Sequence, residues 1–162
     1  MRISTGVTVN VSANTERWLS EIRAGRAFTR GTGLAAVAAN NGHVQLLNPA
    51  ASGVNLIVRG IKFAVNVLGE IRVARYDTAL GTLVGNGLSL LAGGTAALAE
   101  IRTATNVGAL GTLMRQIPAL ASTSVELSPE WWIELGPGEG VVGIDMTVND
   151  TVYGNFDWIE VP

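Results

Sequence analysis

The stretch Gly42–Arg75, GHVQLLNPAASGVNLIVRGIKFAVNVLGEIRVAR, carries the clearest secondary-structure pattern of the chain. Val44 and Leu46 alternate with polar residues, which is the period-two pattern of a strand with one buried face. The segment Asn48–Gly53 then combines a proline with Asn, Ser and Gly, which are residues that favour turns. The whole stretch therefore predicts three β-strands joined by tight turns.

The alternation of the second of these strands changes at Gly60. Before the glycine, Leu56 and Val58 share a face, and after it Ile61 and Phe63 do. A slip of one residue turns every following side chain to the opposite face unless an extra residue absorbs it. Because glycine inside a strand often marks a β-bulge, we predict a bulge at Gly60. The alternative is a strand that is buried on both faces.

The composition fits one domain that makes contacts beyond its own core. The chain has 162 residues, 48% of them apolar and 15% charged, whereas about a quarter of residues are charged in an average domain. The net charge of −2 gives no electrostatic reason to expect nucleic-acid binding. Cysteine is absent, which excludes disulfides and thiol chemistry. No apolar run has the length of a membrane span, so we expect no membrane partner.

An amphipathic helix is expected near the N-terminus, over Thr15–Ala24. Asn14 can cap it and Gly25 can end it, while Trp18 and Ile22 share its apolar side. Such a helix either closes one end of the fold or forms an arm that docks on a partner. The pattern alone leaves both readings open.

The remaining segments predict further short strands and turns. Alternating valines over Val7–Val11 indicate a first strand, and the polar, glycine-containing segment Arg26–Gly33 indicates a link. The sequence Asn40-Asn41-Gly42 has strong hairpin chemistry, so we expect residues 35–39 to pair with residues 43–47. Many short strands with Gly, Pro and Asn turns favour an all-β, jelly-roll-like antiparallel sandwich.

The predicted domain organisation is an N-terminal arm or short helix over residues 1–26 and a β-sandwich domain over residues 27–162. The last strand, Thr151–Val161, has large apolar side chains on both faces. One face can fill the core, and the other predicts a subunit interface, since soluble monomers usually avoid exposed apolar patches. The residues expected at interfaces are Trp18, Ile22, Tyr153, Ile159 and Val161.

No catalytic, metal or cofactor site is predicted. His43 is the sole histidine, and no serine or acid is marked as its partner, so a structural role is favoured. The segment Gly31–Ala36 matches G-x-G-x-x-A but lacks the preceding strand and the later acidic residue of a dinucleotide site. Oxygen donors near one hairpin could hold calcium but fit no known loop spacing, and the prediction is no metal. These donors are Asp145, Asn149, Asp150 and Asp157.

Three segments resemble small β-sandwich structural proteins of tailed bacteriophages, of the capsid decoration type. They are VQLLNPAASGVNLIVRGI (44–61), WIELGPGEGVVGIDM (132–146) and FDWIEVP (156–162). The shared pattern is an Asn-Pro-x-x-Ser-Gly turn, an L-x-P-G-E-G turn before a strand and an aromatic-x-Glu ending. The resemblance covers roughly residues 25 to 162, and its motifs form turns, so it bears on fold more than on role.

The resemblance implies a non-enzymatic virion protein on the capsid surface that forms a homo-oligomer, most often a trimer, and binds the major capsid protein. The N-terminal segment Met1–Arg26 is then expected to reach the capsid lattice, because it lies outside the family-like sandwich. The alternative is a tail or fibre module that binds a receptor or glycan. In that case Trp131, Trp132 or Tyr76 at a loop tip would stack on a sugar.

Overall fold

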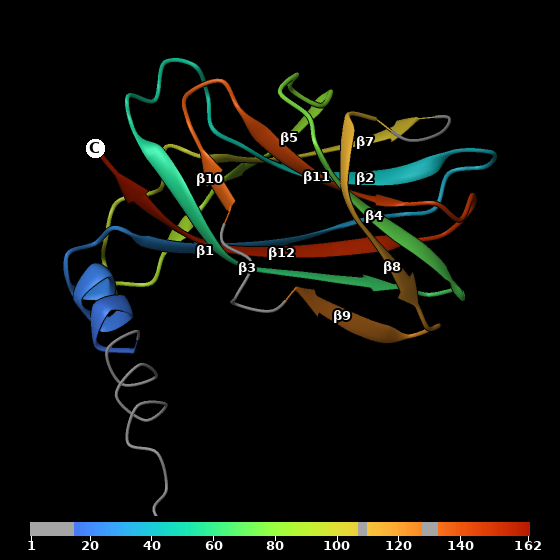
Figure 1. Cartoon of the computed structure of the whole chain (residues 1–162), viewed down its shortest axis with the longest axis horizontal. Coiled ribbons are helices and arrows are strands. Elements are labelled where there is room, and N and C mark those ends of the chain that lie inside the picture. The colour runs from blue at the N-terminus through green and yellow to red at the C-terminus, as the bar shows by residue number, and fades with distance from the viewer. Residues whose placement is uncertain (1–14, 107–109, 128–132) are drawn as a thin grey trace, which may run out of the picture.

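The computed structural model of the chain describes residues 15–106, 110–127 and 133–162. In this part of the chain two antiparallel β-sheets face each other, and a short helix over residues 15–23 precedes the first strand (Figure 1). The prediction of an all-β sandwich with a short N-terminal helix is therefore confirmed. The strands are β1 (Ala27–Leu34), β2 (Asn41–Leu47), β3 (Asn55–Val65), β4 (Gly69–Arg75), β5 (Thr82–Asn86), β6 (Leu88–Ser89), β7 (Glu100–Asn106), β8 (Thr112–Ala119), β9 (Thr123–Leu127), β10 (Ile133–Leu135), β11 (Gly140–Asp145) and β12 (Val152–Val161).

The first sheet, sheet A, is built around the last strand of the chain. β12 pairs with β1 on one side and with β3 on the other, and β6 lies beyond β1. β9 and β10 pair with successive parts of the remaining edge of β3. The second sheet, sheet B, has the order β5-β7-β2-β11-β4-β8. The strands predicted over Gly42–Arg75 exist as β2, β3 and β4, and the chain changes sheet at each of their two turns.

The predicted bulge is present in β3. Gly60 pairs with Asp157 and Val58 pairs with Trp158, so Arg59 has no residue opposite it in β12. The extra residue restores the alternation, and Leu56, Val58, Ile61, Phe63 and Val65 are all buried. The bulge thus keeps one face of a long strand in the core and turns Arg59 away from it.

Two predictions for the start of the chain are wrong. The segment Arg26–Gly33 is not a link, because β1 occupies most of it and pairs with β12 along its whole length. Residues 35–40 form a connection and do not pair with β2, which lies between β7 and β11. Asn41 and Gly42, predicted as turn residues, belong to β2 itself and pair with β7, and Val152 packs directly on Gly42.

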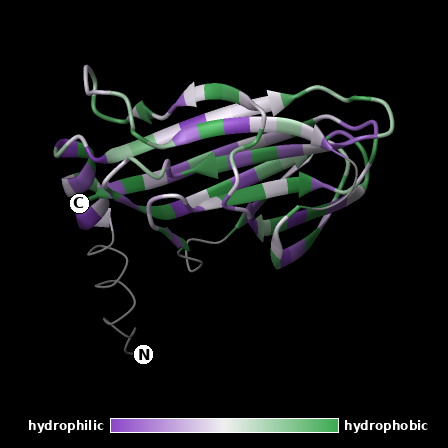
Figure 2. Cartoon of the chain, turned by 90° about the horizontal axis from the view of Figure 1, so that it is seen from above, coloured by the Kyte–Doolittle hydropathy of each residue, from purple (hydrophilic) through white to green (hydrophobic). Residues whose placement is uncertain are grey.

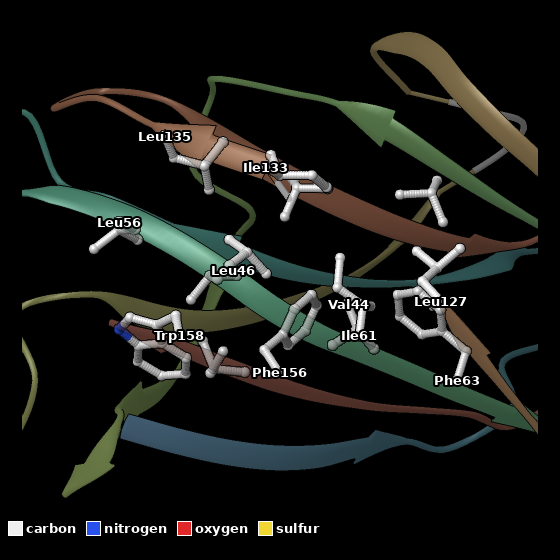
Figure 3. Packing of buried hydrophobic residues seen from close by; sticks show 14 of the residues in the cluster. Val44, Leu46, Leu56, Ile61, Phe63, Leu127, Ile133, Leu135, Phe156 and Trp158 are labelled. Carbon is white, nitrogen blue, oxygen red and sulfur yellow. The ribbon is translucent and has the colours of Figure 1, made fainter. Parts of the chain in front are cut away.

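Aromatic side chains of sheet A rest on glycines across the core. The ring of Phe63 occupies the space that a Cβ at Gly143 would need, and the ring of Trp158 does so at Gly87. Phe63 also meets Phe156 edge to face, with ring centroids 5.9 Å apart. Figure 3 shows these rings among the aliphatic side chains of both sheets. Glycine at these positions therefore allows close packing of the two sheets.

The N-terminal helix ends as the sequence predicts. Gly25 has φ +70° and donates to the carbonyl of Ile22, while Arg26 donates to the carbonyl of Glu21. This pair of bonds is a Schellman motif, which needs a left-handed residue and favours glycine there. The predicted cap Asn14, the predicted strand Val7–Val11 and the two tryptophans at 131 and 132 lie outside the described residues.

Candidate interaction surfaces

The outer face of sheet B is covered by a loop of the same chain. Residues 76–81, here called the strap, connect β4 to β5, which lie toward opposite edges of the sheet. Gln45 holds the strap: its amide nitrogen donates to the carbonyls of Tyr76 and Thr78, at 2.7 and 3.0 Å, and its amide oxygen accepts from the N–H of Leu80 at 3.0 Å. Every polar atom of this buried amide is therefore used.

The strap covers a second, smaller apolar cluster outside the sandwich core. Leu80 packs with Ala74, Val142 and Ile144, and all four are buried. β2 and β11 are buried on both faces along their whole length. The strap accounts for the burial of Gln45, and His43 is buried on the same face of β2.

Aliphatic side chains are exposed at the end of the sandwich that lies away from the helix and the C-terminus. Four connections meet there, residues 35–40, 66–68, 120–122 and 146–151, as the right side of Figure 1 shows. Figure 2 shows hydrophobic segments among these connections. Leu68 is 65% exposed and Leu120 is 63% exposed. We call the exposed set the distal aliphatic residues: Val37, Val67, Leu68, Leu120 and Val148.

The connections at this end are tied together by hydrogen bonds. The carboxylate of Asp150 accepts from the backbone N–H groups of Asn66 and Val67, at 3.3 and 2.9 Å. Asn149 accepts from the N–H of Ala39 at 2.7 Å. The distal aliphatic residues are therefore presented by connections that are held in place.

Two buried carboxyl groups lie beneath this end. Asp145 is fully buried, and its Oδ1 accepts from the N–H of Thr147 at 2.9 Å. Its Oδ2 has no donor among the described residues, and Asp150 is its charged neighbour. Burial, with a further contribution from Asp150, raises the pKa of Asp145 from 3.8 to about 6.

The N-terminal helix covers one end of the outer face of sheet A, where it contacts Arg59. The guanidinium of Arg59, the bulged residue of β3, lies 4.5 Å from the centre of the Trp18 ring. Partial burial lowers the pKa of Arg59, and the nearby carboxylate of Asp157 opposes this effect. The bulge thus places a cation under the helix.

The predicted interface residues do not form one surface. Trp18 and Ile22 are half-buried on the helix, whereas Tyr153, the second residue of β12, is 47% exposed. Ile159 is only 3% exposed within a single copy, and Val161 is half-buried. The expectation that the outward side of β12 is an apolar patch on a monomer is therefore wrong at Ile159, because the chain itself covers this residue.

Further exposed leucines lie in and around the connection after β6. Leu88, Leu90, Leu91 and Leu98 are exposed there, and a cavity of about 420 Å³ lies between this connection and the C-terminus. Buried Glu160 anchors the connection, since its Oε1 accepts from the N–H groups of Leu98 and Ala99 at 2.8 and 2.9 Å. Glu160 therefore holds the connection after β6 against the C-terminal strand.

The described residues bring no metal centre together. They contain no group of three or more His, Cys, Asp or Glu side chains placed to hold an ion. Asp145 and Asp150 are neighbours, but Asp157 lies in sheet A near Arg59 and Asn149 bonds Ala39. His43 is buried, and its Nδ1 is 3.0 Å from the carbonyl oxygen of Asn41, which fits a structural imidazole.

Sequence reasoning missed Gln45, Arg59 and the distal aliphatic residues. The signal for the distal end was present: Val67-Leu68 is an apolar pair where the chain must turn, and turns are usually polar. The signal for the strap was the pair Val141-Val142, which places large apolar groups on both faces of β11. Nothing in the sequence pairs Trp18 with Arg59.

The comparisons with known proteins found no match. No protein-family model, no curated protein and no solved structure matches the chain. In the described part of the chain, no helix is both long and apolar enough to cross a membrane.

Proposed function

We propose that this chain is a virion structural protein of a tailed bacteriophage, a capsid decoration protein that works as a homo-oligomer, most simply a trimer. The three turn and strand motifs quoted above support the phage assignment. The all-β sandwich agrees with the fold that this resemblance implies. The observation that carries the proposal is the set of exposed aliphatic residues at the distal end.

The distal aliphatic residues are suited to contacts between copies. Five large side chains are exposed at one end of the molecule, on connections that are held by Asp150 and Asn149. Burying them in a symmetric contact would stabilise the oligomer by about 25 cal/mol for each Å² of apolar surface removed from water. A closed threefold arrangement uses the same surface on every copy and does not grow further.

The N-terminal segment would make the contact with the major capsid protein. The helix lies at the end of the sandwich opposite to the distal aliphatic residues, as Figure 1 shows. An oligomer joined through its distal ends would therefore leave its N-terminal segments available to the capsid. The two contacts are separate in this arrangement and can be tested separately.

The test uses undecorated heads assembled from the major capsid protein that accompanies this chain. Co-sedimentation is measured for the full chain and for a chain that starts at Thr15, which keeps the helix and its Trp18–Arg59 contact. We expect the full chain to sediment with the heads and the shortened chain to lose at least about tenfold in affinity.

A shortened chain that binds as well as the full chain would remove residues 1–14 from the contact. Absence of binding by both chains would overturn the decoration role. Circular dichroism of the shortened chain provides the control for folding. The variant Gln116→Ala, which changes an exposed residue of β8 and leaves the N-terminal segment intact, is the matched control and should bind as the full chain does.

A further inference from the structure

We infer that pH controls the contact between copies at the distal end through the buried carboxyl pair Asp145 and Asp150, and that the contact is tighter in weak acid than at neutral pH. This inference rests on the homo-oligomer of the proposed function and states how its contact is regulated. It follows from three features of the described residues: the place of the pair beneath the distal aliphatic residues, an unpartnered carboxylate oxygen and the lack of a facing cation.

Asp150 joins two of the connections that carry the distal aliphatic residues. Its carboxylate accepts from the N–H groups of Asn66 and Val67, between β3 and β4, and from the N–H of Thr151 at 2.6 Å in its own connection. Asp150 is only 3% exposed. The two connections present three of the five distal aliphatic residues, which are Val67, Leu68 and Val148. A movement of Asp150 would therefore change most of the proposed contact surface.

Asp145 lies where β11 runs into the connection that contains Asp150. It is the last residue of β11, and its fully buried side chain bonds the N–H of Thr147 through Oδ1. Its Oδ2 has no donor among the described residues. Burying a charged oxygen without a donor is costly, whereas a protonated carboxyl is neutral and can donate a hydrogen bond to Asp150. The pair therefore favours the state in which Asp145 holds a proton.

No cation of the described residues faces this pair. The titratable side chains of the strands packed around it alternate with core residues and point to the outer faces of the two sheets. They are His43, Lys62, Glu70, Arg72, Glu126 and Tyr153. Arg115 lies on β8, two strands away from β11, and is level with Gly143. Asp150 is itself the sole charged residue of the four distal connections, so a proton is the charge that can neutralise the pair.

The proton of Asp145 is lost between weakly acidic and neutral pH. Burial raises the pKa of Asp145 to about 6, and the charge of Asp150 adds to this rise. Above this pH the two neighbouring carboxyls are both charged. Because Asp145 is fully buried, its charge can reach water only if the connection 146–151 moves. This movement displaces Asp150 and Val148, and with them the contact surface.

A contact between copies opposes this movement. In a free copy the connection 146–151 borders water, whereas in the proposed oligomer it lies within the contact. An assembled copy should therefore hold the proton of Asp145 more tightly than a free copy does. Such coupling is reciprocal, so protonation strengthens the contact by the same factor. The contact is strongest below about pH 6 and weakens as the pH rises through the pKa of Asp145.

The experiment measures the dissociation of the full chain by analytical ultracentrifugation over a concentration series at pH 5 and at pH 8. We expect the concentration of half-dissociation to be at least about tenfold higher at pH 8, because one pKa unit between free and assembled copies corresponds to a tenfold change. Circular dichroism at both pH values is the control for folding. An oligomer with equal or tighter association at pH 8 would overturn the inference and leave the oligomer in place. A monomer at both pH values would contradict the oligomer and the inference together.

A variant decides whether Asp145 is the group responsible. Asp145→Asn keeps the size of the side chain and does not titrate, so its dissociation should be the same at both pH values and as tight as that of the wild type at pH 5. Glu134→Gln, which changes an exposed carboxyl on β10, is the matched control and should keep the pH dependence of the wild type. An Asp145→Asn variant that keeps this dependence would overturn the inference.

A second measurement needs no variant and decides the matter if Asp145→Asn does not fold. The heat of dissociation on dilution of the wild type is measured near pH 7 in two buffers with different ionisation enthalpies. The difference between the two heats gives the number of protons released. We expect a release of protons on dissociation, and dissociation without release, or with uptake, would overturn the inference.

Discussion

The chain covers one group of aliphatic side chains outside the sandwich core and leaves another group, at the distal end, exposed. On the outer face of sheet B, the strap buries Leu80 against Val142 and Ile144. At the distal end, Leu68 and Leu120 are exposed on connections that hydrogen bonds hold in place. This contrast is the basis for proposing that the distal surface makes a contact between copies of the chain.

The covered region should be the more costly to disturb. Replacing Gln45 with alanine removes the partners of two carbonyl groups and one N–H group of the strap. We expect Gln45→Ala to lower the free energy of unfolding by about 3–5 kcal/mol, since each buried group left without a partner costs about 1–3 kcal/mol. Urea denaturation measures the loss, with Gln116→Ala in exposed β8 as the matched control. A loss below about 1 kcal/mol would show that the strap does not depend on Gln45.

The same substitution should cost much more stability at a leucine under the strap than at a leucine of the distal end. We expect Leu80→Ala, under the strap, to cost about 2–4 kcal/mol, because it leaves a cavity in a buried cluster. Measured at a protein concentration low enough to keep the chain monomeric, the same change at exposed Leu68 should alter the free energy of unfolding by less than about 0.5 kcal/mol. Equal losses for the two variants would mean that the distal leucine is covered within a single copy.

Stability should vary with pH through Asp145. Its pKa in the folded state, about 6, lies above the ordinary value of 3.8, so the folded protein holds a proton that the unfolded chain releases. This contribution is fully present below about pH 4 and is lost as the pH rises to about 6.

The measurement is thermal or urea unfolding of the wild type and of Asp145→Asn between pH 4 and pH 8. A shift of this size corresponds to about 2–3 kcal/mol, so the wild type should lose up to this amount relative to Asp145→Asn as the pH rises. Glu134→Gln, an exposed carboxyl on β10, is the control and should follow the wild type. A constant difference between the wild type and Asp145→Asn across this range would contradict the assignment.

The contact between the helix and sheet A should contribute only a small part of the stability. Trp18 and Arg59 are both partly exposed, and a cation–π contact of this kind contributes about 0.5–1 kcal/mol. A double-mutant cycle with Trp18→Ala and Arg59→Ala isolates this coupling. A coupling energy near zero would show that the helix is held on the sheet by its other contacts.

The sequence predicts those parts of the fold that depend on local alternation and turn chemistry. The bulge at Gly60 follows from a change of parity, and the helix end follows from Gly25. The prediction of a link at β1 is wrong because its two glycines have low strand propensity and its sequence lacks a clear alternation, whereas its pairing with β12 and β6 provides the backbone hydrogen bonds of a strand.

The surfaces could be predicted only in part. Ile159 was expected at an interface because the sequence does not show which neighbour covers a strand face, and in the structure the same chain covers it. Gln45 was expected to face water because its neighbours Val44 and Leu46 are apolar, and the strap that reverses this comes from 31 to 35 residues further along the chain. Such long-range cover leaves no periodic signal in the strand itself.

The most direct test of the central claim, that the distal aliphatic residues join copies of this chain, is light scattering on the purified protein at micromolar concentration. We expect the mass of a trimer for the wild type and for Leu83→Glu, which changes another exposed leucine, on β5 away from the distal end. The double variant Leu68→Glu and Leu120→Glu should have the mass of a monomer and an unchanged circular dichroism spectrum, because charges at these exposed positions oppose burial in a contact. A monomeric wild type, or a double variant that remains a trimer, would contradict the claim.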